Sequence, residues 1–144
     1  MLIEEPYEVG RLVHLPGKYV VCIHVSLSSK ALSQARILEE AINIINELDV
    51  PVISIKASKL KPEARGQVSM FIDLTNRSEA IKSLVEKLKN IGFIEDVRIV
   101  EPIIKGITID NTSPYPTLLG NRVVMFMKPY YEAMIKTLLS LIHI

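Results

Sequence analysis

The residue types that most often carry chemistry are sparse in this chain and do not fall at the spacings that chemistry requires. The single cysteine, Cys22, stands two residues before His24 within an apolar run. Because alternate residues of a strand share a face, this pair offers two neighbouring metal ligands, or a nucleophile beside a base. A closed zinc site needs four ligands, so the pattern favours ordinary sheet residues. We expect no catalytic residue, metal or other cofactor, and keep a small metal-binding protein or enzyme using Cys22 and His24 as an alternative.

Ligand binding at a polar turn is the second candidate chemistry. Ser28, Ser29 and Lys30 separate a strand pattern from a helical pattern. Backbone amides at the start of a helix attract anions, and a lysine adds positive charge. The serines are equally typical of helix caps. We therefore predict Ser28, Ser29 and Lys30 as ligand-binding residues, with a plain helix cap as the alternative.

Nucleic-acid binding finds little support in the charge pattern. The formal net charge is only +1, so binding would need a local basic cluster. The segment SKLKPEAR supplies Lys59, Lys61 and Arg65, but a basic loop is usually only solvated. An RNA-recognition module stacks bases on strand aromatics, and the segment RGQVSMFI offers Phe71 alone. The sequence disfavours a nucleic-acid partner, which remains a third alternative.

The composition is that of an ordinary globular protein. The chain has 144 residues, of which 49% are hydrophobic and 23% charged. One cysteine allows no internal disulfide, which fits a reducing cytoplasm. No apolar run reaches the roughly 18 residues of a membrane span. We expect a cytoplasmic protein that does not enter a membrane.

The elements that must position these residues follow from apolar periodicity. In the first strand, Tyr19, Val21, Ile23, Val25 and Leu27 alternate onto one face. Asn76 and Glu79 resemble a capping box for the second helix, and Gly92 a left-handed stop. Strands are predicted at 18–27, 51–57, 67–74 and 96–104, and helices at 30–48 and 75–92.

The order strand, helix, strand, strand, helix, strand predicts an α+β fold. Right-handed crossovers in both halves give a ferredoxin-like βαββαβ sandwich, with a four-stranded antiparallel sheet and both helices on one face. A strand and a helix near the C-terminus extend it. The predicted division is 1–17 as an N-terminal extension, 18–104 as the sandwich, 105–120 as a linker, and 121–144 as a strand–helix extension or the start of a truncated second domain.

The opposite face of the sheet is more apolar than a solvated face needs. It includes Val20, Cys22, Phe71 and Val100, and Ile37 and Ile44 widen the apolar stripe of the first helix. We predict from these two surfaces that the protein forms a homodimer or a higher oligomer.

The strand order and the polar turn together resemble the ACT family of regulatory ligand-binding domains, over residues 18–104. In that family an acid-x-Pro-Gly-x-Leu segment opens the first helix, and an amino acid commonly binds there at a subunit interface. Alignment on Leu32 places Leu27 at the acid, Ser29 at the proline and Lys30 at the glycine. The resemblance implies a non-catalytic regulatory or small-ligand-sensing module that self-associates, with an amino acid or organic acid as ligand.

A second resemblance covers the C-terminal part. The segment GNRVVMFMKPYYEAMIKTL looks like the opening strand and helix of an archaeal vinyl-reductase-type, hydrocarbon-binding domain. That domain continues well beyond residue 144. The resemblance therefore implies a truncated member or a fragment of a longer protein.

Overall fold

Two compact units divide the chain, Met1–Thr112 and Ser113–Ile144. The computed structural model describes residues 10–31, 34–59, 63–112, 117–119, 121–125 and 127–142. The first unit contains the predicted sandwich. Its described residues also include 10–17 of the predicted N-terminal extension and 105–112 of the predicted linker.

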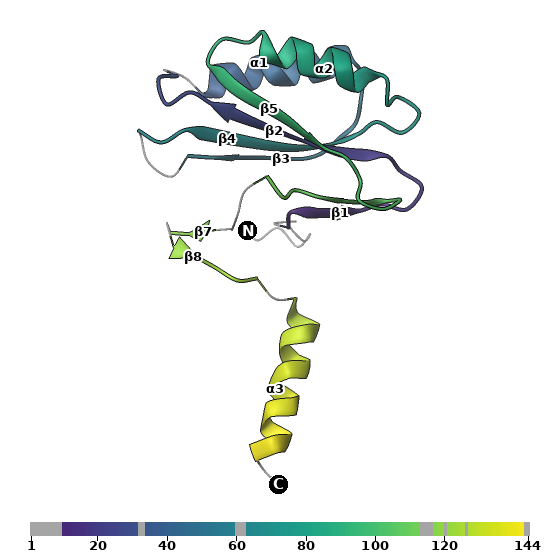
Figure 1. The fold of residues 1–144 in the computed structure, drawn as a ribbon, viewed down its shortest axis with the longest axis vertical. Coiled ribbons are helices and arrows are strands. Elements are labelled where there is room, and N and C mark those ends of the chain that lie inside the picture. The colour runs from purple at the N-terminus through teal and green to yellow at the C-terminus, as the bar shows by residue number, and fades with distance from the viewer. Residues whose placement is uncertain are drawn as a thin grey trace, which may run out of the picture. The chain divides into compact units, whose positions relative to one another are not determined.

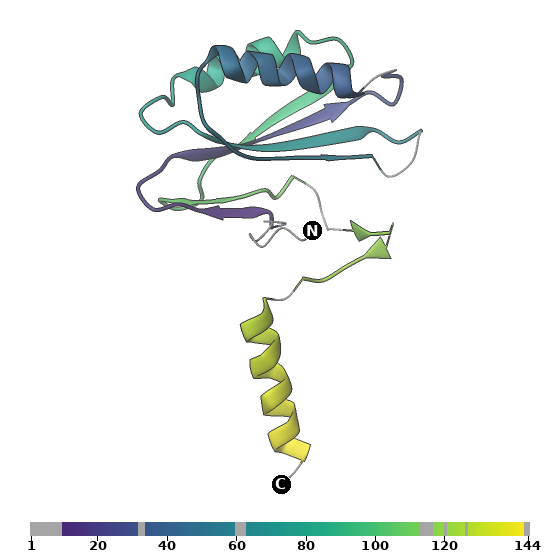
Figure 2. The ribbon, with the colours of Figure 1, turned by 180° about the vertical axis from the view of Figure 1, so that it is seen from behind.

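The first unit has the predicted ferredoxin-like architecture. Its four-stranded sheet has the order β3-β4-β2-β5, with every neighbouring pair antiparallel. Both helices cover the same face of this sheet (Figures 1 and 2). The elements are β2 (Val20–Leu27), α1 (Gln34–Glu47), β3 (Val52–Ser58), β4 (Gly66–Asp73), α2 (Ala80–Lys89) and β5 (Ile94–Val100).

The main core lies between the sheet and the helices. Val21, Ile23 and Leu27 are at most 1% exposed on the inner face of β2, as the alternation predicts. Leu84 and Leu88 are fully buried on the facing side of α2. Each such side chain stabilises the fold by about 1.5–3 kcal/mol. The central strand β2 is thereby fixed, and with it the turn that follows.

The helix starts differ from the predictions. The first helix, predicted from Lys30, begins at Gln34 in the described residues, and Lys30 lies in a turn. The second helix begins at Ala80, and its N-cap residue Glu79 makes no side-chain capping bond. Asn76 has a left-handed φ of 61°, which is incompatible with the extended backbone of a capping residue. The predicted capping box is therefore wrong.

A second, small layer covers the outer face of the sheet. The strands β1 (Leu12–His14) and β6 (Ile107–Ile109) pair antiparallel with each other and form a separate two-stranded sheet. They run beneath the main sheet, on the side away from the helices (Figures 1 and 2). Part of the segment predicted as a linker, 105–120, is thus structured, because its residues 107–109 bond to β1.

The two surfaces predicted for self-association are not exposed apolar surfaces in the structure. Val20, Cys22 and Phe71 are 0–3% exposed and form a second core with Val13 and Leu15 of the layer. The first-helix residues predicted as a second contact also lie inward. Ile37 is buried in the main core and Ile44 packs against it. The apolar outer face is covered by the chain itself.

The second unit contains two short strands and one helix. The strands β7 (Thr117–Leu118) and β8 (Asn121–Arg122) pair with each other, and α3 (Lys128–Ile142) follows. None of the described residues of α3 is buried. Among the helices of the described chain, none combines the length and hydropathy that crossing a membrane requires.

Candidate functional site

The turn after β2 is bonded largely to itself. The amide of Ser28 donates to the carbonyl oxygen of Phe93 at 2.7 Å, and the amide of Ala31 to the carbonyl oxygen of Ser28 at 3.1 Å. The amide of Lys30 donates to the hydroxyl of Ser28 at 3.1 Å. Ser28 therefore closes a local turn, as serines do when they bond to an amide two residues on. Ser29 and Lys30 are exposed to solvent.

Phe93 lies directly beside this turn and has an unusual backbone. Its φ is 70°, in the left-handed region that bulky residues rarely adopt, and its side chain is 53% exposed. The sequence pattern assigned the left-handed stop to Gly92, whose φ is not positive. An exposed aromatic next to the turn was therefore missed, because only the fold brings residues 28 and 93 together.

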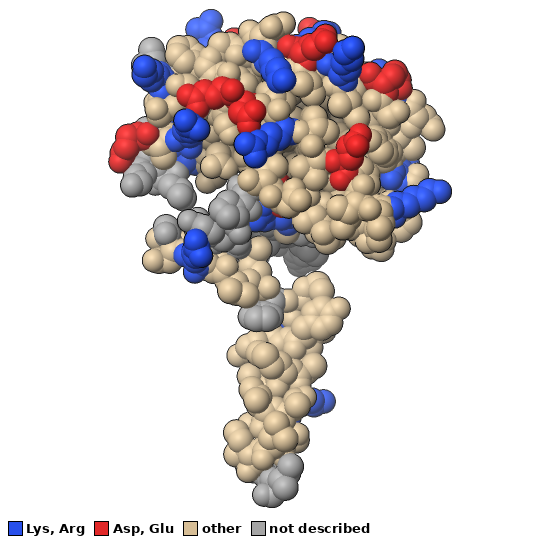
Figure 3. Space-filling model, in the orientation of Figure 1, with Lys and Arg blue, Asp and Glu red and all other residues tan. Residues whose placement is uncertain are grey.

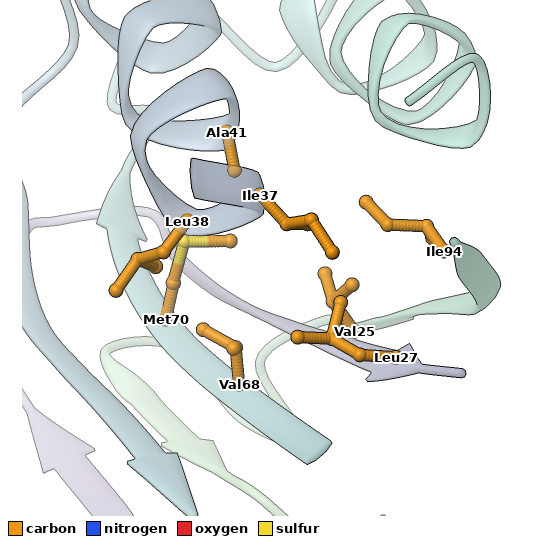
Figure 4. Close-up of a pocket in the computed structure, with 8 residues that line it drawn as sticks. All are labelled: Val25, Leu27, Ile37, Leu38, Ala41, Val68, Met70 and Ile94. Carbon is orange, nitrogen blue, oxygen red and sulfur yellow. The ribbon is translucent and has the colours of Figure 1, made fainter. Parts of the chain in front are cut away.

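A small apolar cavity lies between α1 and the same end of the sheet. Leu27 and Ile94, which adjoin Ser28 and Phe93 in the chain, both line it. Its volume is about 10 Å³, which is room for about one water molecule and not for a whole amino acid. Figure 4 shows the helix side chains facing those of the sheet across it. The lining residues are Val25, Leu27, Ile37, Leu38, Ala41, Val68, Met70 and Ile94.

A buried polar cluster occupies the outer face of the sheet, away from the turn. Asp110 is 7% exposed, and its carboxylate accepts bonds from the hydroxyls of Ser69 at 2.8 Å and Thr112 at 2.5 Å. Since the one proton of the Thr112 hydroxyl is used there, its oxygen accepts from His24 Nδ1 at 2.8 Å. His24 Nε2 lies 3.1 Å from Gln67 Oε1.

The protonation states in this cluster follow from burial and hydrogen bonding. Burial opposes the charged form of Asp110, yet the bonds from Thr112 and Ser69 lower the pKa of its carboxyl group below the ordinary value. Burial raises the pKa of the Cys22 thiol to about 11, and the bond with Ser69 at 3.3 Å does not offset this. A thiol with so little thiolate at neutral pH is a poor nucleophile and a poor metal ligand.

The alternative site of Cys22 and His24 therefore finds no support. The two residues lie on the same buried face, but His24 is engaged by Thr112 and Gln67. Within the described residues, no group of three or more His, Cys, Asp or Glu side chains could hold a metal ion. The cluster holds the outer layer on the sheet, and its geometry does not place a reactive group at the surface.

The residues that could have bound nucleic acid do not form an exposed basic and aromatic surface among the described residues. Phe71 is 2% exposed beneath the outer layer, so it cannot stack on a base. Arg65 pairs with Glu95 at 3.1 Å, and Lys61 lies outside the described residues. Figure 3 shows basic and acidic side chains interspersed over the visible face of the first unit. The remaining residue of the predicted cluster, Lys59, is half-buried.

Comparisons with known proteins support the fold and go no further. No protein-family model matches the sequence, and no curated protein matches it either. The C-terminal domain of the MgtC protein from Mycobacterium tuberculosis is similar, with 13% identity, a TM-score of 0.50, and coverage of 62% of this chain and 93% of that one. At these identities a likeness shows the fold alone.

Two further structures align with somewhat lower scores. The ACT domain of GTP pyrophosphokinase from Chlorobium tepidum has 12% identity, a TM-score of 0.47, and coverage of 58% of this chain and 99% of that one. The P2 domain of the chemotaxis kinase CheA from Thermotoga maritima, in complex with the response regulator CheY, has 22% identity and a TM-score of 0.47. The match covers 58% of this chain and 98% of that one. Nothing in the comparisons supports the resemblance of the C-terminal part to a vinyl-reductase-type domain.

Proposed function

We propose that the first unit is a non-catalytic regulatory module that binds a small amino acid or organic acid at the turn after β2. The observation that carries this proposal is the turn itself, where Ser29 and Lys30 are exposed and the Ser28 amide donates to the carbonyl oxygen of the exposed Phe93. A cation, a hydroxyl and an aromatic side chain are suitable partners for a carboxylate ligand with a short apolar part.

Each of the three predicted residues has a different role in this proposal. The Ser28 hydroxyl already accepts the Lys30 amide, so its part is to hold the turn. The Lys30 ammonium attracts the carboxylate, and the Ser29 hydroxyl is the remaining polar group.

Ligand-induced stabilisation of the full chain tests this proposal. Amino acids and small organic acids are screened by thermal unfolding against the natural protein, Lys30→Ala, and Lys82→Ala as a control that removes an exposed lysine from α2. A ligand at 100 times its dissociation constant stabilises the folded state by about 2.7 kcal/mol. We expect such a shift in the natural protein and in Lys82→Ala, and its loss in Lys30→Ala. Equal shifts in all three proteins, or no shift with any compound, would contradict a site at this turn.

Self-association is the second part of the proposal. We place the contact at an edge of the sheet and not on its outer face, because the outer layer covers that face. The sheet has two edge strands, and β5 carries the charges Glu95, Asp96 and Arg98 that commonly protect an edge. The opposite edge, β3, has the sequence VISIKAS, and the ammonium of its one charged residue, Lys56, donates to the Gly10 carbonyl oxygen. We propose that β3 pairs with β3 of a second copy.

Two isoleucines of equal exposure provide the test. Ile53 in β3 and Ile42 in α1 are both 41% exposed. A lysine at position 53 puts a charge into the edge that the proposed pairing of β3 would use, whereas a lysine at position 42 lies off that edge. We expect sedimentation to show a dimer for the natural protein and for Ile42→Lys, and a monomer for Ile53→Lys. A monomeric natural protein at tens of micromolar, or a dimer in all three, overturns pairing through β3.

A further inference from the structure

The two strands of the outer layer pair with each other and not with the main sheet. We call residues 10–16 and 101–112 the strap. Within it, the Leu15 amide donates to the Gly106 carbonyl oxygen at 2.8 Å and the Asp110 amide to the Arg11 carbonyl oxygen at 2.7 Å. Its strands β1 and β6 form a sheet of their own that is not hydrogen-bonded into the main sheet. The strap is therefore a separate unit of secondary structure.

The described hydrogen bonds between the strap and the main sheet all use side chains. Thr108, which is fully buried, donates its hydroxyl to the Val20 carbonyl oxygen. Ser69 donates to Asp110, and Thr112 bridges Asp110 and His24. Asp110 contributes a carboxylate that is nine-tenths buried and accepts hydrogen bonds from both the strap and the sheet. Val13 and Leu15 of the strap also pack on the second core of Val20, Cys22 and Phe71. A segment without a main-chain ladder to the rest of its domain can open locally before the whole domain unfolds.

We propose that the strap opens from the sheet as one unit while the βαββαβ core stays folded, with the Asp110 carboxylate as its latch. Opening uncovers the buried face of Val20, Cys22 and Phe71. It also frees residues 101–112, which lead directly to the second unit at Ser113. At about 3.4 Å per residue, this segment can span up to roughly 40 Å when it is fully extended. The strap thus sets the length of the tether between the two units.

The chain contains its own probe for this opening. Cys22 is the single cysteine and is 0% exposed beneath the strap, in contact with Ser69. A neutral aromatic disulfide reagent reacts with this thiol only when the strap is open. Its rate, relative to that of the unfolded chain, measures the open fraction in the full natural protein.

The test compares three variants with the natural protein. Asp110→Asn removes the charged acceptor, and Thr112→Val removes the bridging hydroxyl without touching Cys22. Asp73→Asn is the matched control, because Asp73 and Thr75 form the same Asp-x-Thr turn at the end of β4. We expect Asp110→Asn to accelerate labelling about tenfold or more, which corresponds to 1.4 kcal/mol. We expect a smaller increase for Thr112→Val and less than twofold for Asp73→Asn.

The dependence of labelling on urea separates strap opening from global unfolding. Opening of a small unit exposes little surface, so labelling by this route changes only slightly at low urea. Hydrogen exchange provides a second measurement, because strap amides such as that of Asp110 then exchange faster than those of α2. An unchanged labelling rate in Asp110→Asn, or a steep urea dependence in every variant that equals that of global unfolding, overturns the proposal.

Discussion

Replacing Phe71 with alanine tests whether the chain itself covers the outer face of its sheet. Phe71 is 2% exposed, packed with Val20 and Cys22 beneath Val13 and Leu15. Truncation of a fully buried phenylalanine costs about 3–5 kcal/mol. For a domain of about 100 residues, that loss lowers the melting temperature by at least about 12 °C. On an uncovered sheet face, the same truncation would remove little buried surface.

Urea unfolding of Phe71→Ala and Phe93→Ala at two protein concentrations distinguishes the possibilities. Phe93 is the matched control, because it is the same residue type with 53% of its side chain exposed, so its truncation removes about 1 kcal/mol of burial. We expect a large loss for Phe71→Ala that is independent of protein concentration. If both variants lose the same small amount, the strap does not cover Phe71. If the loss shrinks on dilution, a second chain covers it, because dilution removes that contact from the natural protein as well.

Three further predictions concern the strap and the end of α2. Gly106 has a φ of 84°, and an added Cβ would lie 3.2 Å from the Leu15 carbonyl oxygen, so Gly106→Ala should cost about 2 kcal/mol in urea unfolding. Gly92 has open space and no positive φ, so Gly92→Ala should stabilise by about 0.4–1 kcal/mol. Because the pKa of Asp110 is lowered on folding, its stabilising contribution is present above its ordinary value near 3.8 and disappears as the pH falls through the folded value. The urea midpoint should therefore fall more steeply below pH 4 in the natural protein than in Asp110→Asn.

The βαββαβ core could be predicted because its elements carry strong local patterns. β2 alternates over eight residues, and the inner residues Val21, Ile23 and Val25 are the ones that the helices bury. The fold class follows from the order of such elements. The outer layer has no comparable signal, since β1 and β6 are three residues each and lie far apart in the sequence. An apolar outer face was predicted correctly, but the period of a strand does not identify what covers it.

The polar cluster lay beyond sequence reasoning for a related reason. His24 and Thr112 are 88 residues apart and share no motif. The pattern of β6 is also inverted, because Thr108 and Asp110 are buried against the sheet while Ile107 and Ile109 are only half-buried. A conventional reading of ITID places the isoleucines inward. The candidate turn was easier to find, since serines between a strand and a helix are a local signal, but its neighbour Phe93 comes from another part of the chain.

The inverted pattern of β6 has a physical use. Three-residue strands specify their register weakly, and a shift of one residue would turn Thr108 and Asp110 away from the sheet and present the isoleucines instead. Apolar contacts alone would tolerate that shift, because isoleucine also packs well on Val20 and Phe71. The buried polar bonds do not, since a shifted Asp110 would leave Ser69 without its acceptor, and an unmet buried polar group costs about 1–3 kcal/mol. The cluster therefore selects one position of the strap on the sheet, and its loss is expected to permit opening and misplacement before it unfolds the core.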